Sequence, residues 1–394
     1  MSKVGAVAFV WHMHQPFFSS NEEIITYIFE FYHPLVKIHA DLNLPLGLNI
    51  SGVLLDKLIN MKLTFINEVK RLVQRGLVEI LASTYAHAIG FLIPLRHLEL
   101  HVKYDLTLKQ KIFQTSIYGF WPNDLAWFQT LAHIVVEHGL KYLIIEPTGI
   151  QLALSRDVWK LKTLGDSSMV SLNRSTKFIQ IPDEMLYCVY KYRVDIEKKS
   201  FIYILLRNSK ISWFLASDAV LFSSLARSSK SLDTIIDEII RLVDNGAVFI
   251  IGGDAESINP RTALNYKKLL ISLKERGVRI LRPYELIKVN KEQACEIDYI
   301  CSHTMFARHN IFMETIDDLN MLILLRDIFT LEMILCSFKG IELPEWLQKE
   351  ILVAEDSGFF LWRKKTKKIC INKLIKIIHT LQKMLGLKNK SISK

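Results

Sequence analysis

Two aspartates that lie far apart in the chain suggest the chemistry of this sequence. Asp124 closes the segment GFWPND at residues 119–124, and Asp254 follows the glycine pair at residues 252–253. Each comes directly after a short apolar run, so both are expected at strand ends, where α/β barrels carry their catalytic groups. Two carboxylates that face a sugar oxygen are the minimum requirement for cleaving a glycosidic bond. Asp124 and Asp254 are therefore the candidate catalytic pair.

Two histidines close the first apolar run of the chain. His12 and His14 follow residues 7–11 and stand two positions apart, so in an extended segment they face the same side. Such a pair can bind sugar hydroxyls and carboxylates, or backbone groups can satisfy it within the fold. A metal ion would need a third and a fourth ligand, and the sequence near the pair holds no matching cluster. We therefore expect neither a metal nor another cofactor.

A third candidate segment combines a buried acid with a histidine. Glu79 interrupts the otherwise apolar run at residues 78–81, and His87 follows that run. A carboxylate that points into a core is costly unless it is paired. Glu79 is therefore either a partner that orients another site group or a residue on an exposed strand edge.

The elements that would position these residues alternate between strands and helices. Helical periodicity is clear at residues 63–75, 125–138 and 232–244, each followed by a glycine, Gly76, Gly139 or Gly246. A repeated order of strand, helix, glycine and strand predicts βα units on a parallel sheet that closes into a barrel. Residues 208–231 form an irregular, serine-rich stretch, and the pattern is all-helical from residue 303 onward. The expected strands are residues 4–11, 46–50, 78–81, 120–121, 142–145, 201–206, 248–252 and 279–281.

Composition limits the kind of protein. The chain has 394 residues, 50% of them hydrophobic, with a mean hydropathy of +0.20, so it can bury a large core. No signal peptide is expected, and the most apolar stretch, residues 319–338, contains Arg326, Asp327 and Glu332, which argues against a transmembrane helix. The five cysteines match no zinc pattern, and we expect them to be free thiols in a reducing cytoplasm.

The net charge of +10 is concentrated at the C-terminus. Residues 357–394 contain eleven Lys or Arg and no Asp or Glu, so the rest of the chain is close to neutral. A near-neutral body argues against nucleic-acid binding. The last predicted helix, residues 370–387, has one apolar face and one lysine-rich face. That face can lie on an acidic membrane surface, but amphipathic helices more commonly pack on their own domain.

The motifs taken in order resemble glycoside hydrolase family 57, whose members act on α-glucans. The resemblance covers nearly the whole chain, although no single motif is specific. It rests on His14-Gln15-Pro16 with His12 before it, Gly76 to Glu79 with His87, Trp121 to Asp124, Arg207 to Ser212, Asp254-Ala255-Glu256, and Ala354 to Phe359.

The resemblance implies an incomplete, seven-stranded parallel β/α barrel over residues 1–300, followed by a helical domain over residues 301–394 with a basic amphipathic tail. It also implies a retaining double displacement on an α-glucan or maltooligosaccharide, by hydrolysis or transglycosylation. Asp124 would be the nucleophile and Asp254 the general acid/base. The residues implied to bind the sugar are His12, His14, Glu79, His87, Trp121, Arg207 and Glu256.

Four departures from the family pattern fall on the site. Asp124 stands where the family has Glu, which retracts the carboxylate by about 1.5 Å. Trp213 replaces an acid or amide, Gly358 replaces an Asp, and residues 257–259 differ from the family turn. These changes keep two alternatives open: a catalytically weakened or inactive glucan-binding homologue, and different chemistry such as deacetylation, for which the sequence shows no metal triad.

Overall fold

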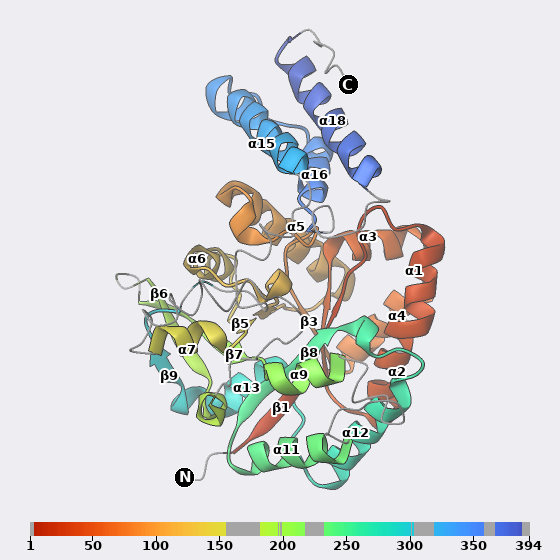
Figure 1. The fold of residues 1–394 in the computed structure, drawn as a ribbon, viewed down its shortest axis with the longest axis vertical. Helices are drawn as coiled ribbons and strands as arrows, with labels where there is room; N and C mark the ends of the chain where they lie inside the picture. The colour runs from red at the N-terminus through yellow and green to blue at the C-terminus, as the bar shows by residue number, and fades with distance from the viewer. Residues whose placement is uncertain are drawn as a thin grey trace.

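The computed structural model of the chain describes residues 4–154, 182–195, 197, 199–216, 232–300, 302, 319–357 and 367–387. Parallel strands lie at the centre and helices surround them (Figure 1). The strands are β1 Ala6–Met13, β2 Leu46–Ile50, β3 Val78–Leu81, β4 Gly119–Phe120, β5 Tyr142–Ile145, β6 Tyr190–Asp195, β7 Ser200–Leu206, β8 Val248–Asp254 and β9 Cys295–Ile297.

The helices that connect the strands vary in length from one or two turns to five. The first group is α1 Asn21–Tyr27, α2 His33–Leu42, α3 Gly52–Asn60, α4 Thr64–Gln74, α5 Leu95–Phe113, α6 Gln129–Glu137 and α7 Thr148–Leu154. The second group is α9 Ser209–Ala216, α11 Leu232–Asp244, α12 Ala263–Glu275, α13 Pro283–Asn290, α15 Leu319–Met333, α16 Glu345–Ala354 and α18 Lys367–Met384.

The strands form two sheets with the orders β3-β2-β1-β8 and β4-β5-β7-β6-β9. All neighbouring pairs are parallel except β6 and β7. Single parallel bridges join the two sheets: Ala82 with Phe120, next to β3 and in β4, and Arg207 with Ile250, next to β7 and in β8. The carboxyl ends of the parallel strands therefore gather on one side of the molecule.

Burial on both faces explains why the central strands, such as β1, are apolar along most of their length. Every residue of β1 is buried, because helices cover the outer face and side chains from neighbouring strands fill the inner face. The predicted helix-ending glycines, Gly76, Gly139 and Gly246, have φ values of 71°, 79° and 88°. Glycine adopts this left-handed conformation without a steric penalty, so each lets the chain turn from a helix into the next strand.

Most expected strands are present, with ends shifted by one or two residues. The run at residues 279–281 contributes only a single bridge, Ile280 with Val7, and β6 and β9 were not anticipated. The expected irregular stretch at residues 208–231 contains helix α9, while residues 217–231 lie outside the described part of the chain.

Helices α15, α16 and α18 pack against one another and enclose a separate hydrophobic cluster, which includes Leu325, Ile351, Leu374 and Leu381. They lie together beyond the carboxyl ends of the strands, shown in blue in Figure 1. The apolar face of α18 is buried in this cluster, so it packs within the protein. None of the helices in the described ranges combines the length and apolar character needed to cross a bilayer.

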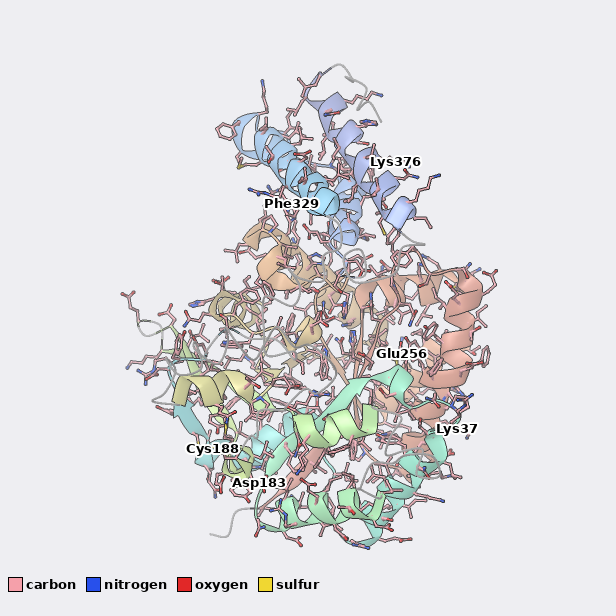
Figure 2. The ribbon with its side chains drawn as sticks, viewed as in Figure 1. Lys37, Asp183, Cys188, Glu256, Phe329 and Lys376 are labelled. Carbon is pink, nitrogen blue, oxygen red and sulfur yellow. A yellow bond between two sulfur atoms is a disulfide. The ribbon has the colours of Figure 1, made fainter. Side chains whose placement is uncertain are left out.

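The expectation that all cysteines are free thiols is wrong for two of them. Cys188 and Cys295 form a disulfide, whereas Cys336 and Cys370 are free and Cys301 lies outside the described residues. Residue Cys295 pairs with Tyr190 in the β6–β9 ladder, which brings the two sulfur atoms together. Cys188 is labelled in Figure 2. This contact between distant strands could not be deduced from cysteine spacing.

Candidate active site

The strand register places the first candidate residues at one level of the sheet. His12 pairs with Asn49 of β2 on one side and with Asp254 of β8 on the other. Side chains alternate along a strand, so all three point to the inner face. A side chain at Gly252 would meet the carbonyl oxygen of Val10 at 1.8 Å, which explains why glycine precedes Asp254. Close approach of β8 to β1 therefore sets the position of this carboxylate.

Three histidines form one cluster at these strand ends. The ring of His87 lies 4.2 Å from that of His14 and 4.8 Å from that of His12, between ring centroids. His87 has a φ of 58°, a left-handed conformation that is uncommon for a residue with a side chain. Trp121 is buried and its ring lies parallel to that of His12, with centroids 6.2 Å apart. The structure thus brings four of the expected sugar-binding residues together.

Hydrogen bonds fix the orientation of each histidine through Nδ1. His12 Nδ1 lies 2.6 Å from Oδ1 of Asn49, whose amide nitrogen donates to the carbonyl oxygens of residues 81 and 82. The Asn49 oxygen must therefore accept, so His12 carries its proton on Nδ1. His14 Nδ1 contacts Ser51 Oγ at 2.9 Å, and His87 Nδ1 contacts Ser357 Oγ at 2.7 Å.

Electrostatics keep His12 and His87 neutral. Burial, followed by repulsion from His14, lowers the pKa of His12 to about 3. The same two causes, together with His12, lower the pKa of His87 well below its usual value. Within the described residues, Nε2 of His12 and Nε2 of His14 are buried without a hydrogen-bond partner. Such unpaired buried nitrogens are costly, and they are common at sites that act on a ligand.

Asp124 is held in a strained turn beside these histidines. Its φ is 51°, and the preceding Asn123 anchors the turn by donating to Thr84 Oγ1 and, at 3.1 Å, to the carbonyl oxygen of Ala88. Burial raises the pKa of Asp124 to about 7, with further contributions from the charges of Asp254 and Asp356. Three carboxyl groups therefore lie close together in this region, and Asp124 ionises near neutral pH.

Asp254 lies close to a cation. Loss of surrounding water raises the pKa of Asp254, and the charges of Arg207 and His14 oppose this rise. Arg207 is buried and donates from Nε to the carbonyl oxygen of Gly252 at 2.6 Å, and from NH1 to Glu146. The guanidinium is thus locked next to Asp254, and it favours the ionised form of that carboxyl group.

Glu256 follows β8 and is labelled in Figure 2. Its Oε1 accepts hydrogen bonds from Tyr32 Oη at 2.6 Å and from Gln15 Nε2 at 2.9 Å. Burial and the nearby charge of Asp254 raise the pKa of Glu256 to about 8. Glu256 therefore joins the first histidine segment to the end of β8.

Glu79 lies apart from the other candidates. It points to the inner face two residues before Leu81, towards the end where the strands begin, and its Oε1 accepts from Tyr142 Oη at 2.6 Å. Its Oε2 accepts from the backbone N–H of Tyr284 at 3.0 Å. Burial raises the pKa of Glu79 to about 7. The structure therefore gives Glu79 hydrogen bonds within the core and does not group it with the histidine cluster.

Two acidic residues at the site were missed from the sequence. Glu146 directly follows β5 and is buried on the inner face, two positions after Ile144, where it accepts from Arg207 and from Ser209. The alternation that identified His12 and His14 would have identified it. Asp356 follows α16, far along the chain, and its Oδ1 lies 3.4 Å from His14 Nε2. Asp356 belongs to the segment Ala354 to Phe359 that carries part of the family resemblance, but it was not predicted as a site residue.

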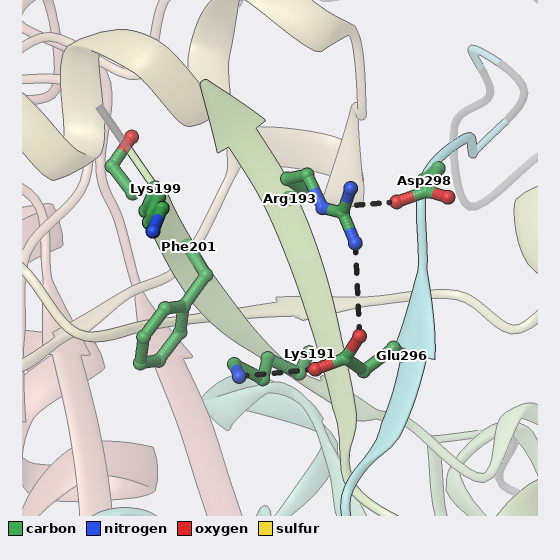
Figure 3. A pocket seen from close by; sticks show the side chains of 7 residues that line it. Lys191, Arg193, Lys199, Phe201, Glu296 and Asp298 are labelled. Atoms are coloured by element: carbon green, nitrogen blue, oxygen red, sulfur yellow. Dashed lines mark hydrogen bonds and ion pairs between the residues drawn. The ribbon is translucent and has the colours of Figure 1, made fainter. Parts of the chain in front are cut away.

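A surface hollow on β6, β7 and β9 lies elsewhere in the molecule (Figure 3). Two of its basic residues are already paired: Lys191 lies 3.1 Å from Glu296, and Arg193 lies 3.3 Å from Asp298. It contains none of the candidate residues, so the strand-end site remains the place for chemistry.

The model of glycosyl hydrolase family 57 matches residues 8–299, which include every one of these residues except Asp356 and Ser357. This chain belongs to glycosyl hydrolase family 57. Among curated proteins, an alpha-amylase of Pyrococcus abyssi is 26% identical over 148 residues, which is 37% of this chain and 22% of the amylase. The match therefore covers less than a quarter of that enzyme.

Solved structures of the family share the fold at low identity. The 4-alpha-glucanotransferase of Thermococcus litoralis has a TM-score of 0.72 and 14% identity, with 99% of this chain and 61% of that chain covered. A family 57 branching enzyme of Thermococcus kodakaraensis has a TM-score of 0.68 and 13% identity, with coverages of 96% and 90%. The alpha-amylase AmyC of Thermotoga maritima has a TM-score of 0.66 and 12% identity, with coverages of 98% and 95%.

Two of the departures from the family 57 pattern fall outside what the structure describes, namely the side chain of Trp213 and the whole of Gly358. The turn after Asp254 forms a short 3-10 helix, Ala255–Ser257. Asp356 lies two positions before Gly358 and provides a carboxylate to the site from the same segment.

Proposed function

We propose that this family 57 protein processes α-glucans or maltooligosaccharides, by hydrolysis or by transfer, through a retaining double displacement. The observation that supports this most strongly is that two carboxyl groups from different strand ends, Asp124 and Asp254, lie near enough for the charge of Asp254 to raise the pKa of Asp124, beside a cluster of three histidines. In a retaining mechanism one carboxylate attacks the anomeric carbon and the other carries the proton.

In the proposed reaction Asp124 attacks and Asp254 protonates the leaving oxygen, then activates the water that releases the sugar. The imidazoles of His12, His14 and His87, with the aromatic face of Trp121, would bind the hydroxyl groups and apolar face of the glucosyl unit. Glu146 would act through Arg207 by holding its guanidinium next to Asp254.

We also propose that the two sheets work as one incomplete seven-stranded barrel over residues 1–300, with residues 301–394 as a helical domain. The single bridges between the two sheets support one barrel. The separate hydrophobic cluster of α15, α16 and α18 supports a distinct helical domain. The near-neutral body and the buried apolar face of α18 favour a sugar substrate over nucleic acid or an acidic surface.

One observation favours the alternative of a weakened or inactive glucan-binding homologue. Asp124 is one methylene shorter than the Glu implied by the resemblance, and its Oδ2 has no hydrogen-bond partner among the described residues. A carboxyl group must be ionised to attack as a nucleophile. With its pKa raised to about 7, Asp124 is protonated in about half of the molecules at a pH near 7.

Incubation with amylose and maltooligosaccharides, followed by analysis of the products, tests the proposal. An active enzyme releases shorter or longer oligosaccharides, and Asp254→Asn lowers the rate by about 10³-fold or more, because it removes the proton carrier. Asp298→Asn, a change on an exposed residue, is the matched control and keeps the wild-type rate. Glucan binding without any product would support the inactive homologue instead.

A further inference from the structure

One contact in the strand-end site has the wrong length for a hydrogen bond. His14 Nε2 and Asp356 Oδ1 lie 3.4 Å apart, whereas N–H···O bonds fall at about 2.7–3.2 Å. Two ligands of a tetrahedral zinc ion, each about 2.1 Å from the metal, are about 3.4 Å apart. One donor atom from His87 completes a set of three in which all atoms lie within 4.8 Å of one another.

Each histidine of the set is held through its other ring nitrogen, as metal-binding histidines usually are. His14 Nδ1 contacts Ser51, and His87 Nδ1 contacts Ser357, which leaves Nε2 of each ring to face a ligand. Metal-binding histidines are generally held in this manner through their second nitrogen. His14 Nε2 is buried and has no hydrogen-bond partner within the described ranges.

Segments far apart in the chain hold the three donors in place. Ala88 and Asp356 form an antiparallel bridge, and the backbone N–H of Ser357 donates to the carbonyl oxygen of His87 at 3.3 Å. The turn after α16 is thus laid along the loop after β3. This pairing explains why the sequence near His12 and His14 shows no third ligand.

We propose that His14, His87 and Asp356 bind a divalent transition-metal ion of the zinc type. Two imidazole nitrogens and one carboxylate oxygen are a donor set that suits zinc, and three protein ligands leave a position open for water or a substrate oxygen. The rings of His14 and His87 lie stacked, with 13° between their planes, so one ring turns for both lone pairs to meet at the ion. The ion would join the helical region to the strand ends and bring positive charge to a region of three carboxylates.

Binding of Zn²⁺ to the full chain, freed of metal with a chelator, tests this site without any assay of glucan activity. Calorimetry is expected to give one Zn²⁺ per chain with a Kd in the micromolar range or below. Co²⁺ is expected to give visible absorption bands of a four- or five-coordinate ion. Failure to bind either ion would overturn the proposal and would leave the proposed glucan chemistry unaffected.

Variants identify the ligands. His14→Ala and Asp356→Asn are each expected to weaken Zn²⁺ binding by about 100-fold or more, and Ser51→Ala by about 10–100-fold through loss of the orienting contact. His133→Ala, which removes an exposed histidine on α6, should bind as the wild type does. Unchanged affinity in both ligand variants would place the ion elsewhere and refute the site. The wild-type Co²⁺ spectrum decides the matter if a variant fails to fold.

Discussion

Two clusters of histidine and carboxylate side chains meet at the turn after α16, which contributes Glu355 to one and Asp356 to the other. They differ in how many of their polar atoms have a hydrogen-bond partner. In the closed cluster, His97 contacts Glu355 through Nδ1 and Glu332 through Nε2, and His101 Nε2 contacts Glu355 at 2.8 Å. In the open cluster, around His12, His14 and His87, two Nε2 atoms remain without a hydrogen-bond partner within the described residues.

The histidines of the two clusters differ in charge. Although burial lowers the pKa of His97, the charges and hydrogen bonds of Glu355 and Glu332 raise it to about 10, so His97 is a cation. His12 and His87, which lack a bonded carboxylate, are neutral. Residue type alone therefore does not identify a binding site. The closed cluster joins α5 to the helical region, and the open cluster keeps its bonding capacity for a ligand.

The largest expected effect is on stability, from breaking the closed cluster. His97→Ala leaves two buried carboxylates, Glu332 and Glu355, without their cation, and we expect a loss of about 3–5 kcal/mol in the free energy of unfolding. Urea denaturation measures this. A loss below about 1 kcal/mol would show that the closed cluster does not hold the helical region in place.

A second expectation concerns alkaline pH. Although burial opposes the rise, the charges and hydrogen bonds of Glu355 and Glu332 raise the pKa of His97 in the folded protein to about 10, whereas its pKa in the unfolded chain is near 6.5. The protonated His97 therefore stabilises the fold fully at a pH below about 6.5, and this contribution is lost as the pH rises to about 10. Between pH 7 and 10 the wild type should therefore lose a few kcal/mol more stability than His97→Gln, which carries no charge to lose. Parallel pH dependences of the two proteins would contradict the ion-pair assignment.

A third expectation concerns activity at the open cluster. If Asp124 attacks as a carboxylate, kcat/KM should rise with pH up to about 7 and fall about tenfold for each pH unit below it. An ordinary aspartate would place this limb near pH 4. A flat profile between pH 5 and 7 would mean that Asp124 does not have to ionise for the reaction.

The smallest expected effect is on stability, from the open cluster itself. His14→Ala removes a ring whose Nε2 makes no hydrogen bond among the described residues and whose Nδ1 contacts only Ser51, so the metal-free protein should lose about 1–2 kcal/mol in the free energy of unfolding, less than His97→Ala. Comparison with His97→Ala by the same urea denaturation gives the contrast. Equal losses in the two variants would remove the distinction between the clusters.

The sequence predicted much of the fold because buried parallel strands are apolar along most of their length, as β1 and β8 are. It missed β6, whose outward residues are partly exposed, and β9, which has only three residues. Both are held by pairing with distant segments, as is the disulfide between Cys188 and Cys295. Such long-range pairing leaves no local pattern.

The candidate site was predictable where residues follow strands. His12, Asp124 and Asp254 lie where strand ends imply, and Glu146 obeys the same alternation although it was overlooked. The family resemblance assigned Glu79 to the sugar site, but its hydrogen-bond partners are Tyr142 and Tyr284. Asp356 depends on the docking of a helical segment onto the loop after β3, which no strand rule predicts.

Covalent trapping of Asp124 tests the central proposal most directly. An activated, fluorinated α-glucoside reacts with a retaining enzyme and leaves a sugar on the nucleophile, because the second step is slowed. Peptide mass spectrometry of the treated protein is predicted to find one glycosyl unit on Asp124, formed more slowly in Asp254→Asn. Absence of any label from a protein that still binds maltooligosaccharides would contradict the account and leave a glucan-binding homologue.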